Sequence, residues 1–226
     1  MVVTPSRETE LDLLARMRAS FGEGALLAGV DEVGRGALAG PVSVGICLID
    51  GATSDGFPVG LRDSKQISPA RREALDPLCR AWGVDLAVGH AGPDVVDAEG
   101  IMVALRRAAA DALAQLVSRG HMPDAVLLDG SHDWWAEASL FDFDPILPQI
   151  PVRMQIKGDA SCAVVAAASV SAKVERDRLM VELDAEYPGY DWASNKGYSS
   201  ARHIEGLRAL GPSPLHRTSW HLPGVS

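Results

Sequence analysis

The chain has 226 residues, a length typical of one domain with a buried core. Apolar residues make up 47% and charged residues 23%, and no apolar stretch approaches the roughly 20 residues that a membrane helix needs. The N-terminus lacks a basic start followed by an apolar block, and the three scattered cysteines are typical of free thiols, so we expect a cytoplasmic protein without a membrane anchor. The net charge of −9 argues against a general nucleic-acid-binding protein but does not exclude a nuclease.

Hydrophobic periodicity predicts the elements in chain order. An amphipathic helix is expected over 7–20, and apolar runs predict strands over 25–32 and 41–50 that pair antiparallel. Ser68 as N-cap and Pro69 in the first turn predict a helix that continues to about Ala81. The remaining predictions are a strand over 84–90, a helix over 101–118, a strand over 125–129, an irregular loop over 131–150, a strand over 152–156, one long helix over 160–186 and a helix over 199–210.

A hairpin of strands followed by alternating strands and helices predicts an α/β fold, with a central mixed sheet flanked by helices. We expect residues 1–226 to form a single domain. Its core would extend over about 25–186, and a small helical or irregular C-terminal extension would cover about 187–226.

Two adjacent acids, Asp31 and Glu32, end the first apolar strand and lead into a glycine-rich turn. A dinucleotide-binding loop is excluded, because the glycine spacing is one residue too long and a strand follows. Solvated turn acids are the simpler alternative, since acids at a strand end are costly unless they face water or bind something. Strand side chains alternate between faces, so both acids enter one site only if the chain twists, or if Glu32 contributes through its main chain or from an outer position.

Two further acids occupy similar positions in the predicted topology. Asp129 ends another apolar strand, and Asp159 precedes the long helix. Taken alone, Asp129 could be a turn residue before Gly130, and Asp159 could be a helix N-cap. Ligands gather near strand ends in α/β sheets, which favours a site shared with Asp31. Four carboxylates without His or Cys are typical of Mg²⁺ or Mn²⁺, and the six His show no zinc-hydrolase spacing.

Six segments resemble signature sequences of the ribonuclease HII family, the type 2 ribonucleases H, in the same order along almost the whole chain. They are the Asp-Glu-x-Gly-Arg-Gly turn at 31–36, then 61–68, 126–130, 157–159 with 166–178, 195–198 with His203, and 216–219. The resemblance implies a ribonuclease H-like fold. It also implies an endoribonuclease that hydrolyses the RNA strand of RNA–DNA hybrids and cuts 5′ of ribonucleotides embedded in duplex DNA, with a role in removing them.

The resemblance implies roles for individual residues. Asp31, Glu32, Asp129 and Asp159 are the expected catalytic and metal-binding acids, which would hold two Mg²⁺ or Mn²⁺ ions for an in-line displacement that leaves a 5′-phosphate and a 3′-hydroxyl. Tyr198 is expected to pack on the deoxyribose next to the ribonucleotide. The other expected substrate-binding residues are Gly34, Arg35 and Gly36, which would read the 2′-hydroxyl; Lys65, Lys173, Arg176 and Lys196, which would contact phosphates; and Ser169, which shares a helical face with Lys173 and Arg176.

Three features depart from the family pattern and affect the expected substrate preference rather than the acids. They are Glu175 inside a basic stretch, Asn195 in place of a common His, and the long 131–150 loop. His203 is either structural or part of the site. Two other functions stay open: a catalytically silent hybrid-binding protein of the same fold, and a metal-dependent phosphoester hydrolase that does not recognise the 2′-hydroxyl. We expect a monomer that binds RNA–DNA hybrids and ribonucleotide-containing DNA.

Overall fold

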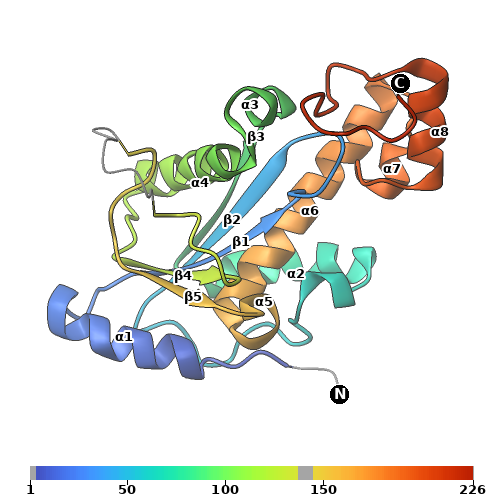
Figure 1. Cartoon of the computed structure of the whole chain (residues 1–226). Coiled ribbons are helices and arrows are strands. Elements are labelled where there is room, and N and C mark those ends of the chain that lie inside the picture. The colour runs from blue at the N-terminus through green and yellow to red at the C-terminus, as the bar shows by residue number, and fades with distance from the viewer. Residues whose placement is uncertain (1–3, 137–144, 226) are drawn as a thin grey trace.

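The computed structural model describes residues 4–136 and 145–225, and within them five strands form one mixed sheet (Figure 1). Their spatial order is β3-β2-β1-β4-β5. Strand β2 pairs antiparallel with both β1 and β3, whereas β1, β4 and β5 run parallel. The predicted mixed sheet and its opening antiparallel hairpin are confirmed. The strands are β1 (Leu27–Val33), β2 (Val42–Ile49), β3 (Asp85–Ala91), β4 (Ala125–Asp129) and β5 (Val152–Gln155).

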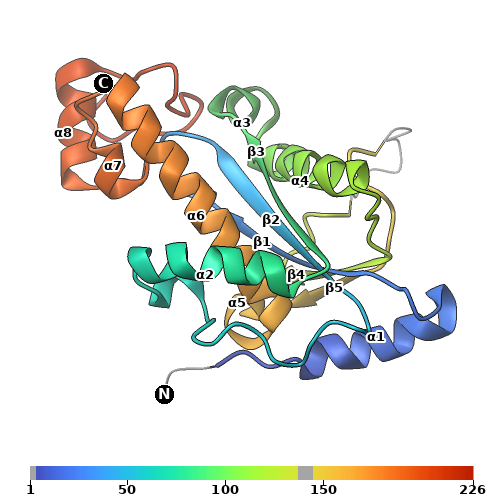
Figure 2. The same cartoon turned by 180° about the vertical axis from the view of Figure 1, so that it is seen from behind.

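Helices cover both faces of the sheet (Figures 1 and 2). Helices α1, α2 and α6 bury their apolar side chains against one face, and α3 and α4 pack on the other. Helices α7 and α8 lie at the far end of α6 with the C-terminal tail (Figure 1). No described helix is both long and apolar enough to cross a membrane. The helices are α1 (Glu8–Phe21), α2 (Pro69–Trp82), α3 (Pro93–Glu99), α4 (Ile101–Ser118), α5 (Gly158–Ser161), α6 (Ala163–Glu186), α7 (Trp192–Asn195) and α8 (Ala201–Leu210), with a 3₁₀ turn at Ser64–Gln66.

Glycines in the strands allow the helices to approach the sheet closely. A Cβ added at Gly29 in β1 would lie 2.6 Å from the carbonyl carbon of Val164, and one at Gly45 in β2 would lie 2.4 Å from the carbonyl oxygen of Ala168. Both distances are too short for real contacts, so α6 packs backbone to backbone on the central strands. This contact fixes α6 along the strands that carry Asp31.

The structure corrects three sequence predictions. The helix expected over 160–186 is two helices, because Cys162 has an extended backbone that separates α5 from α6. Helices α3 and α7 are short, and the sequence pattern does not predict them. The helix at Pro69 begins as predicted, but the Ser68 side chain makes no capping hydrogen bond. Of the loop predicted over 131–150, residues 137–144 lie outside the described residues.

Candidate active site

Strand pairing places Asp31 beside Asp129. The parallel register of β1 and β4 pairs Val30 with Leu128, so the next residue on each strand is one of these acids. Adjacent strands lie about 4.8 Å apart, and residues in register on parallel strands point to the same face. Asp31 is 8% exposed, and its Oδ1 accepts a hydrogen bond of 2.8 Å from the Glu32 N–H. Burial and the charge of Asp129 raise its pKa well above the ordinary value.

Asp159 joins these acids through the short helix α5. The Oδ1 atom of Asp129 accepts hydrogen bonds from the N–H groups of Gly158, at 2.6 Å, and of Asp159, at 3.4 Å. Burial and the Asp129 charge raise the pKa of Asp159 to about 6, although Lys65, whose Nζ lies 3.9 Å from its Oδ2, opposes the rise. The same ion pair raises the pKa of Lys65. Partial burial would lower its pKa, but the charges of Asp159 and Asp31 raise it.

Glu32 lies on the opposite face of β1 from Asp31. The strand stays regular through Val33, so the twist considered from the sequence does not occur. The Glu32 carboxylate lies 3.4 Å from Arg35, and Arg35 also contacts Met102 of α4. Burial raises the pKa of Glu32, and the Arg35 charge opposes this. Glu32 nevertheless lines the same cavity as Asp31, because both lie near the end of the strand.

The four acids line two adjoining cavities. One, of about 400 Å³, is lined by Asp31 and Glu32 together with the glycine turn; the other, of about 390 Å³, is lined by Asp129 and Asp159. Lys65 lines both cavities. Within residues 4–136 and 145–225, no three acid, His or Cys side chains lie close enough together to hold a metal ion by themselves.

The donor chemistry of these cavities fits a hard divalent cation. Their possible ligands are carboxylates, with no imidazole or thiolate among the lining residues. Mg²⁺ characteristically takes one or two carboxylates and completes its shell with water and substrate phosphate, so a tight protein cage is not required. Burial, with repulsion from Asp129, raises the pKa values of Asp31 and Asp159, and a cation would offset that repulsion.

Two buried arginines, Arg176 and Arg217, pack against the glycine turn and the residues that follow it. Arg176 of α6 donates hydrogen bonds to the carbonyls of Pro41, Lys196 and Ala39, at 2.8, 2.9 and 3.3 Å. Its side chain is 0% exposed, which contradicts the expected direct phosphate contact. The helical periodicity predicts a solvent-facing polar stripe, but the C-terminal segment covers this part of α6.

Arg217 is the residue that sequence reasoning missed. It is fully buried and donates to the carbonyls of Gly34 at 2.7 Å, Arg35 at 2.8 Å and Gly40 at 3.1 Å. Burial, with a contribution from the Arg176 charge, lowers its pKa to about 10, so it stays protonated at neutral pH. The 216–219 motif could have indicated a role, but its partners are carbonyl groups that no sequence pattern displays.

The turn that lines the cavity also carries backbone N–H groups without a hydrogen bond among the described residues. Gly34 has φ +82°, and a Cβ there would lie 2.1 Å from Arg176 Nε, so only glycine fits. Gly36 differs, since a Cβ there would meet nothing within 4 Å. Within the described chain, the N–H groups of Arg35 and Gly36 make no hydrogen bond, and both residues are exposed. The N–H groups of Arg35 and Gly36 are therefore unpaired, while Arg217 binds the carbonyls of Gly34 and Arg35.

Tyr198 closes the cavity from the C-terminal segment. Its hydroxyl accepts a hydrogen bond of 3.1 Å from the Gly34 N–H, and the Arg176 guanidinium lies 5.6 Å from its ring centre. Tyr198 is 38% exposed and lines the cavity. The Tyr198 carbonyl accepts a hydrogen bond of 2.9 Å from Nδ1 of His203.

A buried network determines the tautomers of two histidines and holds Tyr198 in place. Because His203 donates from Nδ1, its Nε2 is an acceptor, for the Trp192 indole at 3.1 Å and for His216 Nε2 at 3.0 Å. His216 Nδ1 then accepts from the N–H and hydroxyl of Ser213, each at 2.9 Å. His203 is fully buried and lines neither cavity, so its role is structural.

The remaining predicted contacts divide between the cavity and a neighbouring groove. Ser169 and Lys173 line the cavity; Ser169 donates to the Ser64 hydroxyl at 2.9 Å, and Lys173 Nζ lies 2.5 Å from Asp177. Lys196 lies instead in an adjacent groove of about 620 Å³ that Lys173 also lines. Glu175 is absent from both cavities and pairs with Arg80.

Comparison with known proteins agrees with this geometry. The family profile described as Ribonuclease HII matches residues 28–222. Ribonuclease HII of Streptomyces coelicolor is 46% identical over 204 residues, covering 90% of this chain and 80% of that protein, and the protein of the same name from Roseobacter denitrificans is 42% identical over 197 residues, covering 86% and 89%.

Solved structures show the same fold. Ribonuclease H2 from Pyrococcus horikoshii OT3 is 27% identical with a TM-score of 0.64, covering 88% of this chain and 95% of that one. The structure of the PCNA:RNase HII complex from Archaeoglobus fulgidus gives 26% identity and a TM-score of 0.64, covering 86% and 93%. The matched sequence, the shared fold and the strand-end acids agree: the chain belongs to the ribonuclease HII family and is a ribonuclease H endonuclease.

Proposed function

We propose that this ribonuclease H hydrolyses the RNA strand of RNA–DNA hybrids and also cuts 5′ of single ribonucleotides embedded in duplex DNA, so that they can be removed. The main support for this proposal is that Asp31, Glu32, the glycine turn and Tyr198 line one cavity. Acids that can hold cations near a phosphate and backbone groups that can read a sugar thus lie within one site.

The four acids are the proposed metal ligands. Asp31 and Asp129 would bind from adjacent strand ends, Asp159 from α5, and Glu32 from the other face of β1. Two Mg²⁺ or Mn²⁺ ions bound there would lower the pKa of the attacking water and stabilise the leaving 3′-oxygen, and the products would carry a 5′-phosphate and a 3′-hydroxyl. Lys65 would keep the Asp159 carboxylate ionised and contact a neighbouring phosphate.

The glycine turn and Tyr198 are the proposed reader of the sugar. The free N–H groups of Arg35 and Gly36 can approach a ribose because nothing fills the space beside Gly36. The exposed ring of Tyr198 can pack on the next deoxyribose, which lacks the 2′-hydroxyl. Such a pair would recognise one ribonucleotide followed by DNA.

The cavities that the expected phosphate-binding residues line divide these residues into three groups. Lys65, Lys173 and Ser169 line the cavities and stay proposed contacts, and Lys196 would bind farther along in the adjacent groove. Arg176 instead supports the turn. We further propose that the chain acts as a monomer.

The test uses three labelled substrates, with and without Mg²⁺ or Mn²⁺: a DNA duplex with one ribonucleotide, an RNA–DNA hybrid, and an all-DNA duplex. We expect cation-dependent cleavage of the first two, with a 3′-hydroxyl on the fragment upstream of the ribonucleotide. Cleavage of the all-DNA duplex at a similar rate would contradict recognition of the 2′-hydroxyl. An intact single-ribonucleotide duplex would contradict the junction activity.

A further inference from the structure

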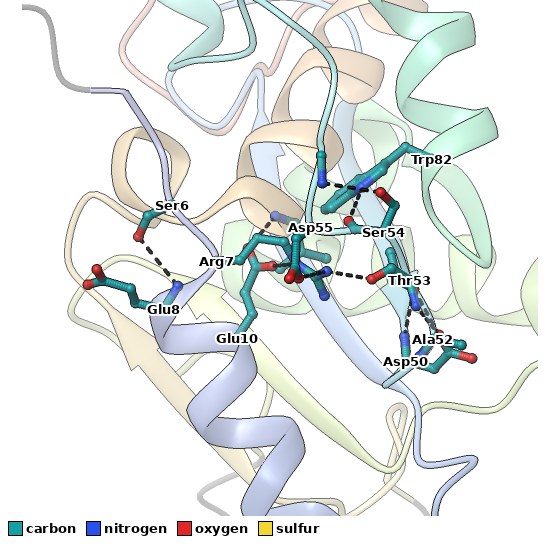
Figure 3. Close-up of polar contacts among 12 residues, drawn as sticks. Ser6, Arg7, Glu8, Glu10, Asp50, Ala52, Thr53, Ser54, Asp55 and Trp82 are labelled. Carbon is teal, nitrogen blue, oxygen red and sulfur yellow. Dashed lines mark hydrogen bonds and ion pairs between the residues drawn. The ribbon is translucent and has the colours of Figure 1, made fainter.

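The segment that precedes the family match carries two buried charged residues, Arg7 and Glu10. The match begins at residue 28, whereas Arg7 is 5% exposed and Glu10 0% exposed. Figure 3 shows the two side chains meeting between α1 and the loop at residues 50–55. Burying a charge is costly unless it is paired and hydrogen-bonded, so the contacts of this pair indicate what it does.

Glu10 caps helix α6 from a distant part of the chain. The first N–H groups of a helix have no partner within the helix, and a side chain at the N-cap often accepts from them. The N-cap of α6 is Cys162, which makes no such bond. Instead the Oε1 atom of Glu10 accepts a hydrogen bond of 2.6 Å from the Val164 N–H. A carboxylate at this place also interacts favourably with the helix dipole.

The backbone of Ser6 spans the break between α5 and α6. Its N–H donates to the Ser161 carbonyl at 2.9 Å, and its own carbonyl accepts from the Ala163 N–H at 3.1 Å. One bond therefore holds the end of α5 and the other holds the start of α6. Cys162 between them is extended, so no continuous helical hydrogen bonding fixes the angle between the two helices.

Arg7 anchors this arrangement to the rest of the molecule. Its Nε donates to Glu10 Oε2 at 3.1 Å, and its Nη1 donates to the Thr53 carbonyl at 2.6 Å and to Asp55 at 2.9 Å. The guanidinium also lies 5.6 Å from the centre of the Trp82 ring. The carboxylate that caps α6 is thereby held by the loop after β2 and by α2 (Figure 3).

Helix α5 carries Asp159 and also provides the Gly158 N–H that binds Asp129. We infer that Glu10, held by Arg7, is a positioning residue of the acidic site. By capping α6 it fixes the start of that helix, to which the Ser6 backbone joins the end of α5, and so it sets where Asp159 lies relative to Asp129 and the affinity for the divalent cation. This inference rests on the proposed metal-dependent function. Glu10 does not contact the cavities and acts through backbone groups.

The test compares full-length Glu10→Leu, which keeps the volume but cannot accept a hydrogen bond, with Glu10→Gln, which keeps an acceptor but loses the charge. Glu8→Leu is the matched control, since Glu8 lies on the same helix turn, is exposed and points away from Arg7 in Figure 3. Mn²⁺ binding without substrate is followed by the paramagnetic resonance signal of the free ion. The Mn²⁺ concentration for half-maximal hybrid cleavage is measured in parallel, well below each melting temperature.

We expect Glu10→Leu to weaken Mn²⁺ binding about tenfold and to raise the half-maximal Mn²⁺ concentration equally, with kcat at saturating Mn²⁺ reduced less than threefold. Glu10→Gln should give a smaller shift, and Glu8→Leu none. A folded Glu10→Leu or Glu10→Gln protein with lower thermal stability but unchanged Mn²⁺ affinity would overturn the positioning role alone. Cleavage by the wild type without any divalent cation would instead overturn the proposed function.

Discussion

Replacing Arg217 with Met should separate support of the glycine turn from chemistry at the acids. The change removes three hydrogen bonds from a charged donor to the carbonyls of Gly34, Arg35 and Gly40. Taken at the low end for such bonds, they contribute together about 4–5 kcal/mol. This is a net value that already includes the cost of burying the charge, the same burial that lowers the Arg217 pKa to about 10. The unfolding free energy should therefore fall by about 4–5 kcal/mol, and cleavage is measured well below the lowered melting temperature.

A second effect should be on cleavage. Released from Arg217, the turn no longer presents the Arg35 and Gly36 N–H groups in one geometry, and losing one or two hydrogen bonds in the transition state lowers kcat/KM by about 10- to 100-fold. The assay compares kcat/KM on the single-ribonucleotide duplex with the melting temperature of the same protein. Arg107→Met is the control, because Arg107 lies on the surface of α4 and pairs there with Glu99 of α3. If the Arg217→Met protein cleaves within twofold of the wild type, the turn does not depend on this guanidinium.

Three further changes probe the acids, the turn and the histidine network. Asp129→Asn should lower kcat at least about 100-fold, near 3 kcal/mol of barrier, with folding intact; a variant retaining a tenth of the rate would contradict the ligand role. Gly36→Ala should leave the melting temperature unchanged, since its Cβ meets nothing, yet lower kcat/KM on the single-ribonucleotide duplex; full activity would exclude close approach of the sugar there. His216 has a pKa lowered to about 4 by burial, so between pH 6.5 and 4 the unfolded chain binds a proton that the folded chain does not. The stability advantage of the wild type over His216→Gln should therefore shrink by about 3 kcal/mol as pH falls from 7 to 4 in urea unfolding, and a constant difference would contradict the neutral network.

The convergence of the strand-end acids could be predicted, because it follows from local rules. Apolar runs that end in Asp31 and Asp129 predict strands, and parallel strands bring their carboxyl ends to one edge. The alternation rule also places Glu32 correctly on the other face. The break at Cys162 could not be predicted, since the groups that stabilise it belong to Ser6 and Glu10, far away in the sequence.

Arg176 illustrates why solvent exposure is harder to predict than helix periodicity. Its spacing from Ser169 and Lys173 correctly places all three on one side of α6. Which part of that side faces water depends on what covers it, and Arg176 is covered by the C-terminal segment and by the chain before β2, where it binds the carbonyls of Lys196 and Pro41. The helical spacing of a charged residue therefore predicts the side of the helix on which it lies. The groups that it binds can be identified only from the tertiary structure.

The continuity of helix α6 limits where insertions and deletions can occur in the chain. At its start the helix adjoins the turn that carries Asp159, and farther along it provides Ser169 to the cavity and Arg176 to the glycine turn. Each residue added to or removed from a helix rotates the downstream part of that helix by about 100° and shifts it by about 1.5 Å. A single deletion between Ser169 and Arg176 would thus swing the guanidinium out of register with the turn. The helix therefore fixes the spacing and the orientation of α5 relative to the glycine turn, and length changes in this family should accumulate in loops on either side of it.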